Sequence, residues 1–254
     1  MPLTLLSLQD HIATITLNAD AKRNIFSDAM LTEVLAHFDE CEITKARVVI
    51  IRANAAAPVW TAGHDLSLVQ PGADPTDPDS LLILFLKRIR YFPAPVIAMV
   101  NASVWGGGCE LIMACDLAIA AEHATIAMTA SKMGLPYDPG LLGRWLRHCS
   151  IHKIKEMFFT AQPISAADAY AAGIYNHVVP ADELEAFTLQ IAATIAANSP
   201  EGNANIKYQL NALSKAPQLD ADTFAELQAA RTRLLHSDTF RERLRALKEK
   251  LRIE

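Results

Sequence analysis

The sequence predicts an α/β core of alternating strands and helices, followed by an all-helical C-terminal region. Short apolar runs such as 48–51 and 96–100 are typical of buried strands. Segments with helical spacing of apolar residues separate them, and the pattern stays helical from Asp182 onward. With 254 residues, 51% of them hydrophobic, the chain can form one large domain, or one domain with an appendage.

Each expected element follows from a local pattern. Threonines alternate with apolar residues in 11–17, which indicates a half-buried strand that forms a hairpin with 3–8. Ser27 is a suitable N-cap for a helix that runs to about Glu42. A loop rich in Pro, Gly and Asp is expected at 70–79. The other expected elements are strands at 48–51, 96–100, 116–121, 124–128 and 176–179, helices at 81–89, 110–114, 141–148, 152–160 and 166–171, and helical breaks at 199–200 and Pro217.

Three glycines, Gly106, Gly107 and Gly108, lie between the expected strand at 96–100 and the expected helix at 110–114. Without side chains in this turn, backbone N–H groups at the start of the helix can face a ligand, and the helix dipole favours an oxygen anion. The spacing matches neither GxGxxG nor a P-loop, because no GK[ST] follows. An earlier stretch, AGHDL at 62–66, accompanies the glycines, and the pair favours a ligand site over a purely structural turn.

Charge, hydropathy and cysteine spacing argue against several classes of protein. A formal net charge of −5 argues against nucleic-acid binding through bulk charge. No apolar run approaches the roughly 18 residues of a membrane span, and the N-terminus lacks a signal-peptide pattern. The four cysteines form no CxxC pair, which favours reduced thiols and a cytoplasmic location. His64 and Asp65 have no third ligand at a suitable spacing, so no metal site is expected.

The segment 97–111, together with AGHDL, resembles the crotonase (enoyl-CoA hydratase/isomerase) superfamily, and the order of elements agrees over essentially the whole chain. The resemblance implies a spiral of ββα units over 1–195 and a C-terminal helical region over 196–254 that builds a homotrimer or a dimer of trimers. The substrate would be an acyl-CoA, with no cofactor beyond the coenzyme A of the substrate. Within the superfamily, the stretches most like the methylmalonyl-CoA decarboxylases are AGHDL, SVWGG at 103–107, GLPY at 134–137, and 159–179.

The resemblance also implies catalytic roles. The backbone N–H groups of His64 and Gly107 would donate to the thioester oxygen and stabilise an enolate there. Glu110 falls at the first glutamate position of the hydratases, but the second falls near Ala130, which cannot activate water. Tyr137 matches a tyrosine whose hydroxyl holds a substrate carboxylate. The expected reaction is therefore loss of CO₂ from methylmalonyl-CoA or a similar malonyl-type CoA, with propionyl-CoA as the product from methylmalonyl-CoA.

The remaining implied contacts concern the substrate and its CoA. The loop at Ala21, Lys22 and Arg23 would approach the adenine and the phosphates. Thr129 matches a substrate-contacting threonine, and Lys250 matches a C-terminal lysine that reaches CoA. The neighbours of His64 that would line the same site are Ala62, Gly63, Asp65 and Leu66.

Two other classes of function stay open at this point. An enoyl-CoA isomerase or hydratase of the same fold would use Asp138 or Glu110 as its acid or base. A non-catalytic acyl-CoA or nucleic-acid binder is disfavoured by the complete pair of amide donors and by the acidic net charge. Structural explanations also exist, because Glu110 could brace the glycine turn, Tyr137 could pack against its loop, and Asp138 before Pro139 is a common turn residue.

Overall fold

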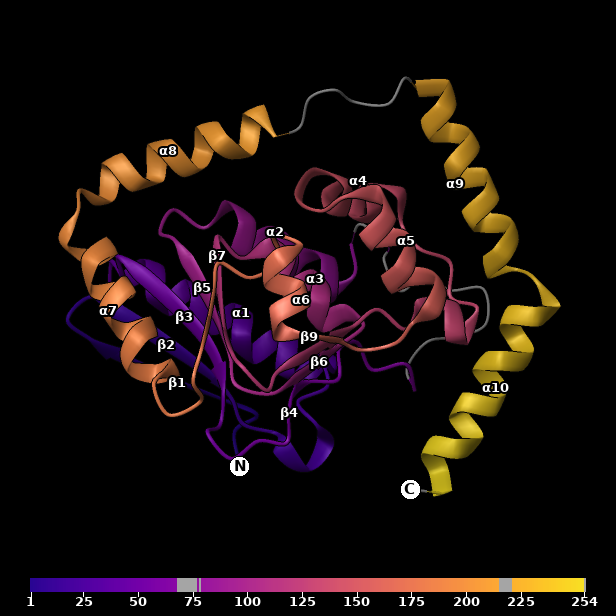
Figure 1. Cartoon of the computed structure of the whole chain (residues 1–254), viewed down its shortest axis with the longest axis horizontal. Helices are drawn as coiled ribbons and strands as arrows, with labels where there is room; N and C mark the ends of the chain where they lie inside the picture. Colours follow the sequence, from indigo (N-terminus) through magenta and orange to yellow (C-terminus); the bar gives the residue numbers. More distant parts are fainter. Residues whose placement is uncertain (68–76, 78, 215–220, 254) are drawn as a thin grey trace.

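The computed structural model describes residues 1–67, 77, 79–214 and 221–253. Two β-sheets form its centre, and helices surround them (Figure 1). The first sheet has the strand order β1-β2-β3-β5-β7-β10, and the second has the order β4-β6-β8-β9. The strands are β1 (Thr4–Gln9), β2 (Ile12–Leu17), β3 (Val48–Ala53), β4 (Val59–Thr61), β5 (Val96–Val100), β6 (Ser103–Trp105), β7 (Leu117–Ala121), β8 (Thr125–Ala127), β9 (Ile164–Ser165) and β10 (His177–Val179).

The helices follow the sequence pattern closely, and the α/β fold class is confirmed. The α-helices of the described chain are α1 (Asp28–Ile43), α2 (Leu81–Tyr91), α3 (Gly107–Ala114), α4 (Pro139–His148), α5 (Ile151–Thr160), α6 (Ala166–Ala171), α7 (Leu184–Ala197), α8 (Pro200–Leu213), α9 (Ala221–Leu235) and α10 (Asp238–Ile253). Two short 3₁₀ helices, η1 (Asp20–Lys22) and η2 (Ala130–Met133), lie in loops. Ser27 caps α1 by accepting a hydrogen bond from the N–H of Met30, as its type predicts.

The first sheet begins with an antiparallel hairpin and continues with parallel strands. Asp10 and His11 form the hairpin turn with φ of 50° and 64°, so β2 begins one residue later than expected. From β2 to β10 the neighbouring strands run parallel. Every residue of β5 is buried, because helices cover both faces of the sheet.

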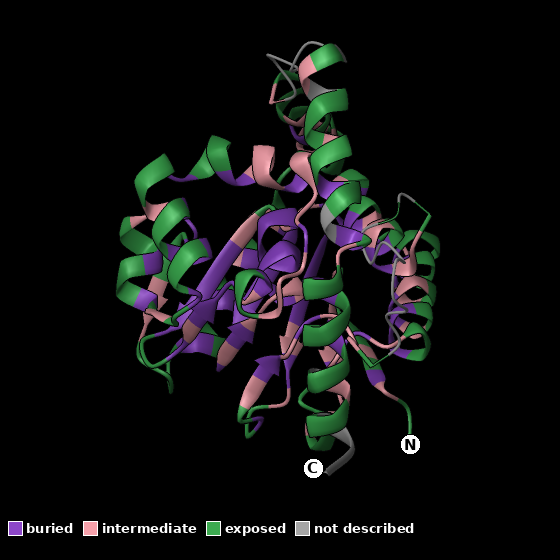
Figure 2. Ribbon diagram, turned by 90° about the vertical axis from the view of Figure 1, so that its right-hand side faces the viewer, coloured by how far each residue is buried: buried purple, intermediate pink, exposed green. Residues whose placement is uncertain are grey.

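Alternate residues of the central strands belong to two separate cores. Val49 and Ile51 of β3 pack with α1, α2 and α3 on one face of the sheet, whereas Val48 and Ile50 pack with α7 on the other. Figure 2 shows the buried strands at the centre and the exposed faces of the helices around them. The helices α1, α2 and α3 therefore cover one face of the first sheet. The helix α3 begins within the glycine-rich segment 106–108.

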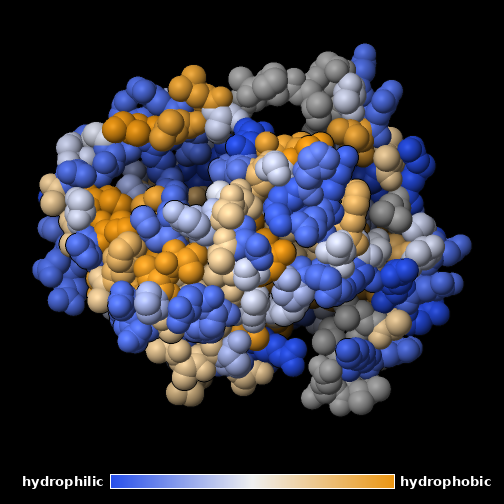
Figure 3. All heavy atoms as spheres, in the orientation of Figure 1, coloured by the Kyte–Doolittle hydropathy of each residue, from blue (hydrophilic) through white to orange (hydrophobic). Residues whose placement is uncertain are grey.

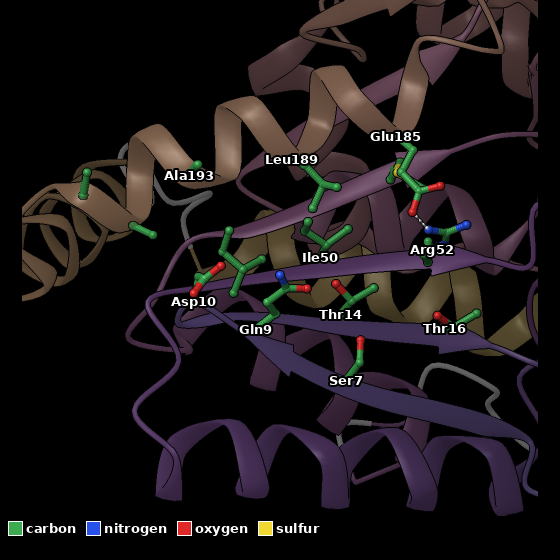
Figure 4. A pocket seen from close by; sticks show the side chains of 14 residues that line it. Ser7, Gln9, Asp10, Thr14, Thr16, Ile50, Arg52, Glu185, Leu189 and Ala193 are labelled. Atoms are coloured by element: carbon green, nitrogen blue, oxygen red, sulfur yellow. Dashed lines mark hydrogen bonds and ion pairs between the residues drawn. The ribbon is translucent and has the colours of Figure 1, made fainter.

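A groove of about 630 Å³ lies on the other face, between α7 and the first strands (Figure 4). Thr14 and Thr16 line it from β2, which explains why threonines alternate with the core residues of that strand. At one end Arg52 and Glu185 form an ion pair of 2.5 Å. This groove is separate from the glycine-rich segment.

Several expectations need correction. The helix expected at 110–114 begins three residues earlier, so Gly107 and Gly108 are in its first turn and Gly106 alone precedes it as N-cap. The short strands β4, β6 and β9 were not expected from the sequence, since each has at most three residues. The expected loop at 70–79 lies outside the described residues apart from Asp77 and Asp79, and so does the expected break at Pro217.

The C-terminal helices pack on the same chain. Leu235, Phe240 and Leu244 form a small apolar cluster with Leu66 and Leu135, which belong to loops of the core. The view in Figure 1 shows α9 and α10 along the side of the molecule that carries α4 and α5. The expected boundary between 195 and 196 falls in the last turn of α7. No described helix has the length and apolar character that crossing a membrane requires.

A buried lysine ties α8 to the core. The ammonium of Lys207 donates to the carbonyls of Ile89 and Ala94 at 3.1 Å and to Asp116 at 2.6 Å. The Asp116 carboxylate in turn accepts a hydrogen bond of 2.7 Å from the N–H of Val96, the first residue of β5. One cation thus fixes the end of α2, the start of β5 and the loop after α3.

We expect Lys207→Met to lower the free energy of unfolding by about 3 kcal/mol, because a partly buried carboxylate and two carbonyls lose their donor. Chemical unfolding measures this change. Lys155→Met on the exposed face of α5 is the matched control and should change the free energy by less than about 0.5 kcal/mol. Equal effects of the two substitutions would contradict the anchoring role.

Candidate functional site

Two backbone segments meet at the start of α3. The loop after β4 carries Gly63, whose φ of 80° is the left-handed conformation that favours glycine. A Cβ atom at Gly63 would lie 2.5 Å from the carbonyl oxygen of Trp105 and 2.6 Å from the amide nitrogen of Gly107. A Cβ atom at Gly107 would lie 3.0 Å from the amide nitrogen of His64. The amides of His64 and Gly107 are therefore close neighbours, with no side chain between them.

Both amides are available to a ligand. Within the described chain, neither the His64 N–H nor the Gly107 N–H has a hydrogen-bond acceptor. The flanking residues hold the loop in place, because Phe26 donates to the Gly63 carbonyl at 2.7 Å and accepts from Asp65 at 3.3 Å. Gly107 is also the first residue of α3, so the helix dipole adds partial positive charge. The arrangement suits an oxygen that becomes negatively charged.

Asn24 is a functional support that the sequence analysis missed. It is fully buried, its side chain accepts from the N–H of Ala19 and donates to the Trp60 carbonyl, and its own carbonyl accepts from the Thr61 hydroxyl at 2.6 Å. Thr61 in turn accepts from the Gly63 N–H at 3.0 Å. Asn24 thus connects the 19–24 loop to the loop of His64. Its left-handed φ of 50° is typical of Asn, but this pairing over 36 residues has no local signal.

A small cavity of about 70 Å³ opens beside the two amides. Most of its walls are apolar, and Glu110 carries the one carboxylate among the described residues that line it. Ala130 also lines it, so the position expected for a second hydratase glutamate faces the cavity with a methyl group. The lining residues are Ala62, His64, Leu66, Leu82, Gly106, Gly107, Glu110, Met128, Thr129, Ala130, Met133, Leu135, Pro136, Tyr137 and Leu141.

Glu110 is the centre of a polar network in this wall. Its Oε1 atom accepts a short hydrogen bond from the Tyr137 hydroxyl and a second one of 2.6 Å from the Trp145 indole N–H. The Nη1 atom of Arg144 lies 3.6 Å from Oε2, yet neither atom has a hydrogen-bond partner in the described chain. The side chain of Glu110 is only 3% exposed. The carboxylate is therefore held at Oε1, whereas its buried Oε2 has no hydrogen-bond partner among the described residues.

Burial dominates the acid–base properties of these groups. It raises the pKa of the Glu110 carboxyl, and the Arg144 guanidinium and the hydrogen bonds from Tyr137 and Trp145 oppose this shift. Burial also lowers the pKa of His64, although Asp65 and Asp28 act in the opposite direction. The pKa of Tyr137 lies well above its ordinary value because of burial and the neighbouring Glu110. His64 is thus a neutral imidazole at pH 7, and Tyr137 keeps its proton.

Comparison with known proteins identifies the family. The model of the enoyl-CoA hydratase/isomerase family matches residues 7–254. The chain belongs to this family. It is 38% identical to the methylmalonyl-CoA decarboxylase of Escherichia coli (strain K12), over 94% of this chain and 92% of that protein. It is 30% identical to a short-chain-enoyl-CoA hydratase of Clostridium acetobutylicum, over 86% and 84% of the two chains. The structure of a methylmalonyl-CoA decarboxylase with 2-nitronate-propionyl-CoA matches with a TM-score of 0.94 at 36% identity, over 98% and 96%.

This membership confirms the crotonase fold. Asp138, expected as an alternative acid or base for an isomerase, does not line the cavity. Its carboxylate caps α4 by accepting from the Leu141 N–H at 3.0 Å, and its other oxygen lies 3.5 Å from the Gln228 amide. The structure thus gives Asp138 the turn and cap role that Asp before Pro favours.

The residues expected to hold CoA occupy two separate places. Lys22 and Arg23 are exposed next to the His64 loop, because the Arg23 carbonyl accepts from the Ala62 N–H at 2.8 Å. Lys250 is exposed near the end of α10. The Asp65 carboxylate accepts from the N–H and the hydroxyl of Ser67, which makes it a loop brace. Among the described residues of this crotonase-family chain, no group of three His, Cys, Asp or Glu side chains could hold a metal.

We expect Gly63→Ala to reduce turnover of the enzyme's CoA thioester at least 100-fold, because the new Cβ must displace the Gly107 amide from the oxyanion. Steady-state kinetics on the folded variant measure this. Gly143→Ala is the matched control, because its Cβ would meet only Arg147 at an ordinary 3.6 Å. Near-normal turnover of the Gly63 variant would exclude the His64 and Gly107 amides as the oxyanion site.

Proposed function

We propose that this crotonase-family enzyme decarboxylates methylmalonyl-CoA, or a closely related malonyl-type CoA thioester, to propionyl-CoA or its analogue and CO₂. The observation that carries the proposal is that Ala130 lines the same cavity as Glu110, which has the one carboxylate among the described lining residues. Hydration in this family is expected to use two carboxylates to hold and activate water. Decarboxylation needs an electron sink and a drier environment for the substrate carboxylate, and the cavity suits both. The similarity to the Escherichia coli decarboxylase supports the same choice.

The amides of His64 and Gly107 supply the electron sink. When the carboxylate leaves as CO₂, the electron pair of the broken C–C bond moves into the thioester and places negative charge on its oxygen. Two preorganised N–H donors stabilise this charge more strongly than the neutral carbonyl, which lowers the barrier. Losing one such donor typically costs about 3 kcal/mol of transition-state stabilisation. The enolate carbon then takes a proton from water or a nearby acid, and neither biotin, metal nor thiamine is required.

Tyr137 is the residue that we assign to the substrate carboxylate. Its hydroxyl is in the cavity wall beside Glu110, and the surrounding walls are apolar. A carboxylate held there loses most of its hydration, whereas the CO₂ that it becomes is uncharged. Desolvation therefore raises the energy of the ground state relative to the transition state. The neutral imidazole of His64 lines the same cavity and can contact the carboxylate or the departing CO₂.

The assembly that we propose is a homotrimer, or a dimer of trimers, in the cytoplasm. Several large apolar side chains on α8 are exposed in the single chain, and Figure 3 shows apolar atoms over this helix. A second copy of the chain would cover them. These side chains are Ile206, Tyr208, Leu210 and Leu213, with exposed fractions from 57% to 74%. The four cysteines are unpaired, which suits a reducing compartment.

Product analysis tests the function. The pure protein should convert methylmalonyl-CoA to propionyl-CoA and CO₂ and should leave crotonyl-CoA unchanged. Tyr137→Phe should lower decarboxylation at least tenfold without weakening binding of propionyl-CoA, because only a hydrogen bond to a charged group is lost. Tyr170→Phe, exposed on α6, is the control. Hydration of crotonyl-CoA or a shifted double bond without CO₂ release would instead support a hydratase or isomerase.

The CoA contacts have a separate test. Removing the charges of Lys22 and Lys250 together should raise the KM for the CoA thioester several-fold and leave kcat unchanged, because phosphate contacts bind the ground state and the transition state equally. Arg241→Ala on an exposed face of α10 is the control. An unchanged KM in the double variant would remove both lysines from the CoA site.

A further inference from the structure

The Tyr137 hydroxyl has a single proton, and this proton is already donated in a hydrogen bond to Glu110. A tyrosine hydroxyl donates one hydrogen bond, and this one donates to the Oε1 atom of Glu110. An ionised carboxylate only accepts, so it cannot donate back to the tyrosine. While Glu110 is ionised, Tyr137 therefore has no proton to offer to a substrate carboxylate. The two roles of the hydroxyl are mutually exclusive.

Opposing effects act on the charge of Glu110, and burial, which raises the pKa of its carboxyl, is the largest of them. Burial favours the neutral acid, and Asp138, from the loop before α4, acts in the same direction. Arg144 of α4 favours the ionised form from 3.6 Å, and the donors Tyr137 and Trp145 do the same. His64, which lines the same cavity, is neutral and does not compensate a charge. Arg144 is therefore the one full positive charge that the described residues place against the carboxylate.

A substrate carboxylate changes this balance. It adds a negative charge in the same small cavity, and two carboxylates that share an apolar site cannot both stay ionised easily. Glu110 is the carboxylate of the pair that has an unpartnered oxygen and a hydroxyl neighbour able to rearrange. Protonation at Glu110 would remove the repulsion and release the tyrosine proton together.

We propose that, at a pH at which Glu110 is ionised in the free enzyme, binding of the substrate carboxylate is coupled to uptake of one proton by Glu110, and that Arg144 is the positioning residue which favours the ionised form before the substrate arrives. This inference rests on the proposed function, because it needs a substrate with a carboxylate. The proton comes from solvent and forms one O–H bond on Oε1. That O–H donates to the Tyr137 oxygen, the Trp145 N–H keeps the remaining lone pair of Oε1, and the Tyr137 O–H turns to the substrate.

The sign of the pH dependence follows from this coupling. The protonated form of Glu110 accepts the substrate, so kcat/KM should decrease as the pH rises above the pKa of Glu110 in the free enzyme. Arg144 holds that pKa down, so its removal should move the decrease to a higher pH. A merely structural role of Arg144 would lower kcat/KM at every pH and leave the midpoint of the decrease where it was.

Calorimetry measures the proton directly. Binding of 2-carboxypropyl-CoA, a thioether that has a carboxylate but no thioester, is titrated in buffers of different ionisation enthalpy above the free-enzyme pKa. We expect uptake that approaches about one proton per site. Propionyl-CoA, which has the same CoA but no carboxylate, should take up far less. Equal uptake for the two ligands, or none for either, would overturn the proposal.

Three variants assign the proton and the positioning role. Glu110→Gln should bind 2-carboxypropyl-CoA without proton uptake, because its amide cannot titrate. Arg144→Met should move the decrease of kcat/KM upward by about one pH unit. Arg147→Met, an exposed arginine one turn further along α4, is the control and should leave the midpoint unchanged. Uptake that persists in the Glu110 variant, or a midpoint that Arg144→Met leaves unchanged, would refute the assignment.

The outcome is separable from that of the proposed function. Wild-type enzyme that releases CO₂ from methylmalonyl-CoA but takes up no proton with the carboxylate ligand would refute the coupling and leave the decarboxylase assignment in place. Wild-type enzyme that releases no CO₂ would refute the function itself. If Arg144→Met does not fold, the calorimetry of the wild type and of the Glu110 variant still decides the coupling.

Discussion

The close approach of the Gly63 and Gly107 backbones is the contact on which the site depends. A side chain at either position would separate the two amides that face the cavity. The neighbouring residues maintain this contact. Thr61 and Asn24 hold the loop of Gly63 through hydrogen bonds, and β6 ends two residues before α3 begins at Gly107. Gly108 completes the fit, because its Cβ would meet the Thr61 side chain at 2.4 Å. Two backbones thus form a rigid donor pair without any charged side chain.

The polar chemistry of the cavity is concentrated on one carboxylate. Glu110 combines deep burial with donors from two segments that follow it by 27 and 35 residues. Ionising such a buried carboxyl costs free energy, and so does leaving it without hydrogen-bond partners. Small changes in its surroundings therefore decide whether it is ionised or protonated. The Tyr137–Glu110 pair is therefore best treated as one unit whose proton can occupy either member's hydrogen bond. Glu110 can therefore be both a buried structural group and a group that exchanges a proton, whereas the sequence alone leaves these two roles as alternatives.

Most of the fold was predictable because it rests on local patterns. The apolar runs identified the longer strands, Ser27 marked the start of α1, and the glycines marked the turn whose N–H groups face the cavity. What escaped prediction depends on pairing across the chain. The buried Asn24, the Arg144 guanidinium and the strands β6 and β9 have no distinctive local pattern, because distant partners define them. Asp138 was ambiguous for the same reason, since one residue type serves equally as a helix cap and as a base.

The small apolar cluster of the C-terminal helices forms late in synthesis, because its buried members come from the end of the chain. Leu66 and Leu135 line the cavity and pack against Leu235, Phe240 and Leu244 from the end of the chain. Both sheets are complete by β10, long before those residues leave the ribosome, and domains generally fold from the N-terminus during synthesis. A nascent chain would therefore have the His64 and Gly107 amides in place before the residues that pack against Leu66 and Leu135 have been made. A chain that ended before α10 would keep both sheets, but Leu66 and Leu135 would lose the apolar side chains of Phe240 and Leu244 that pack against them.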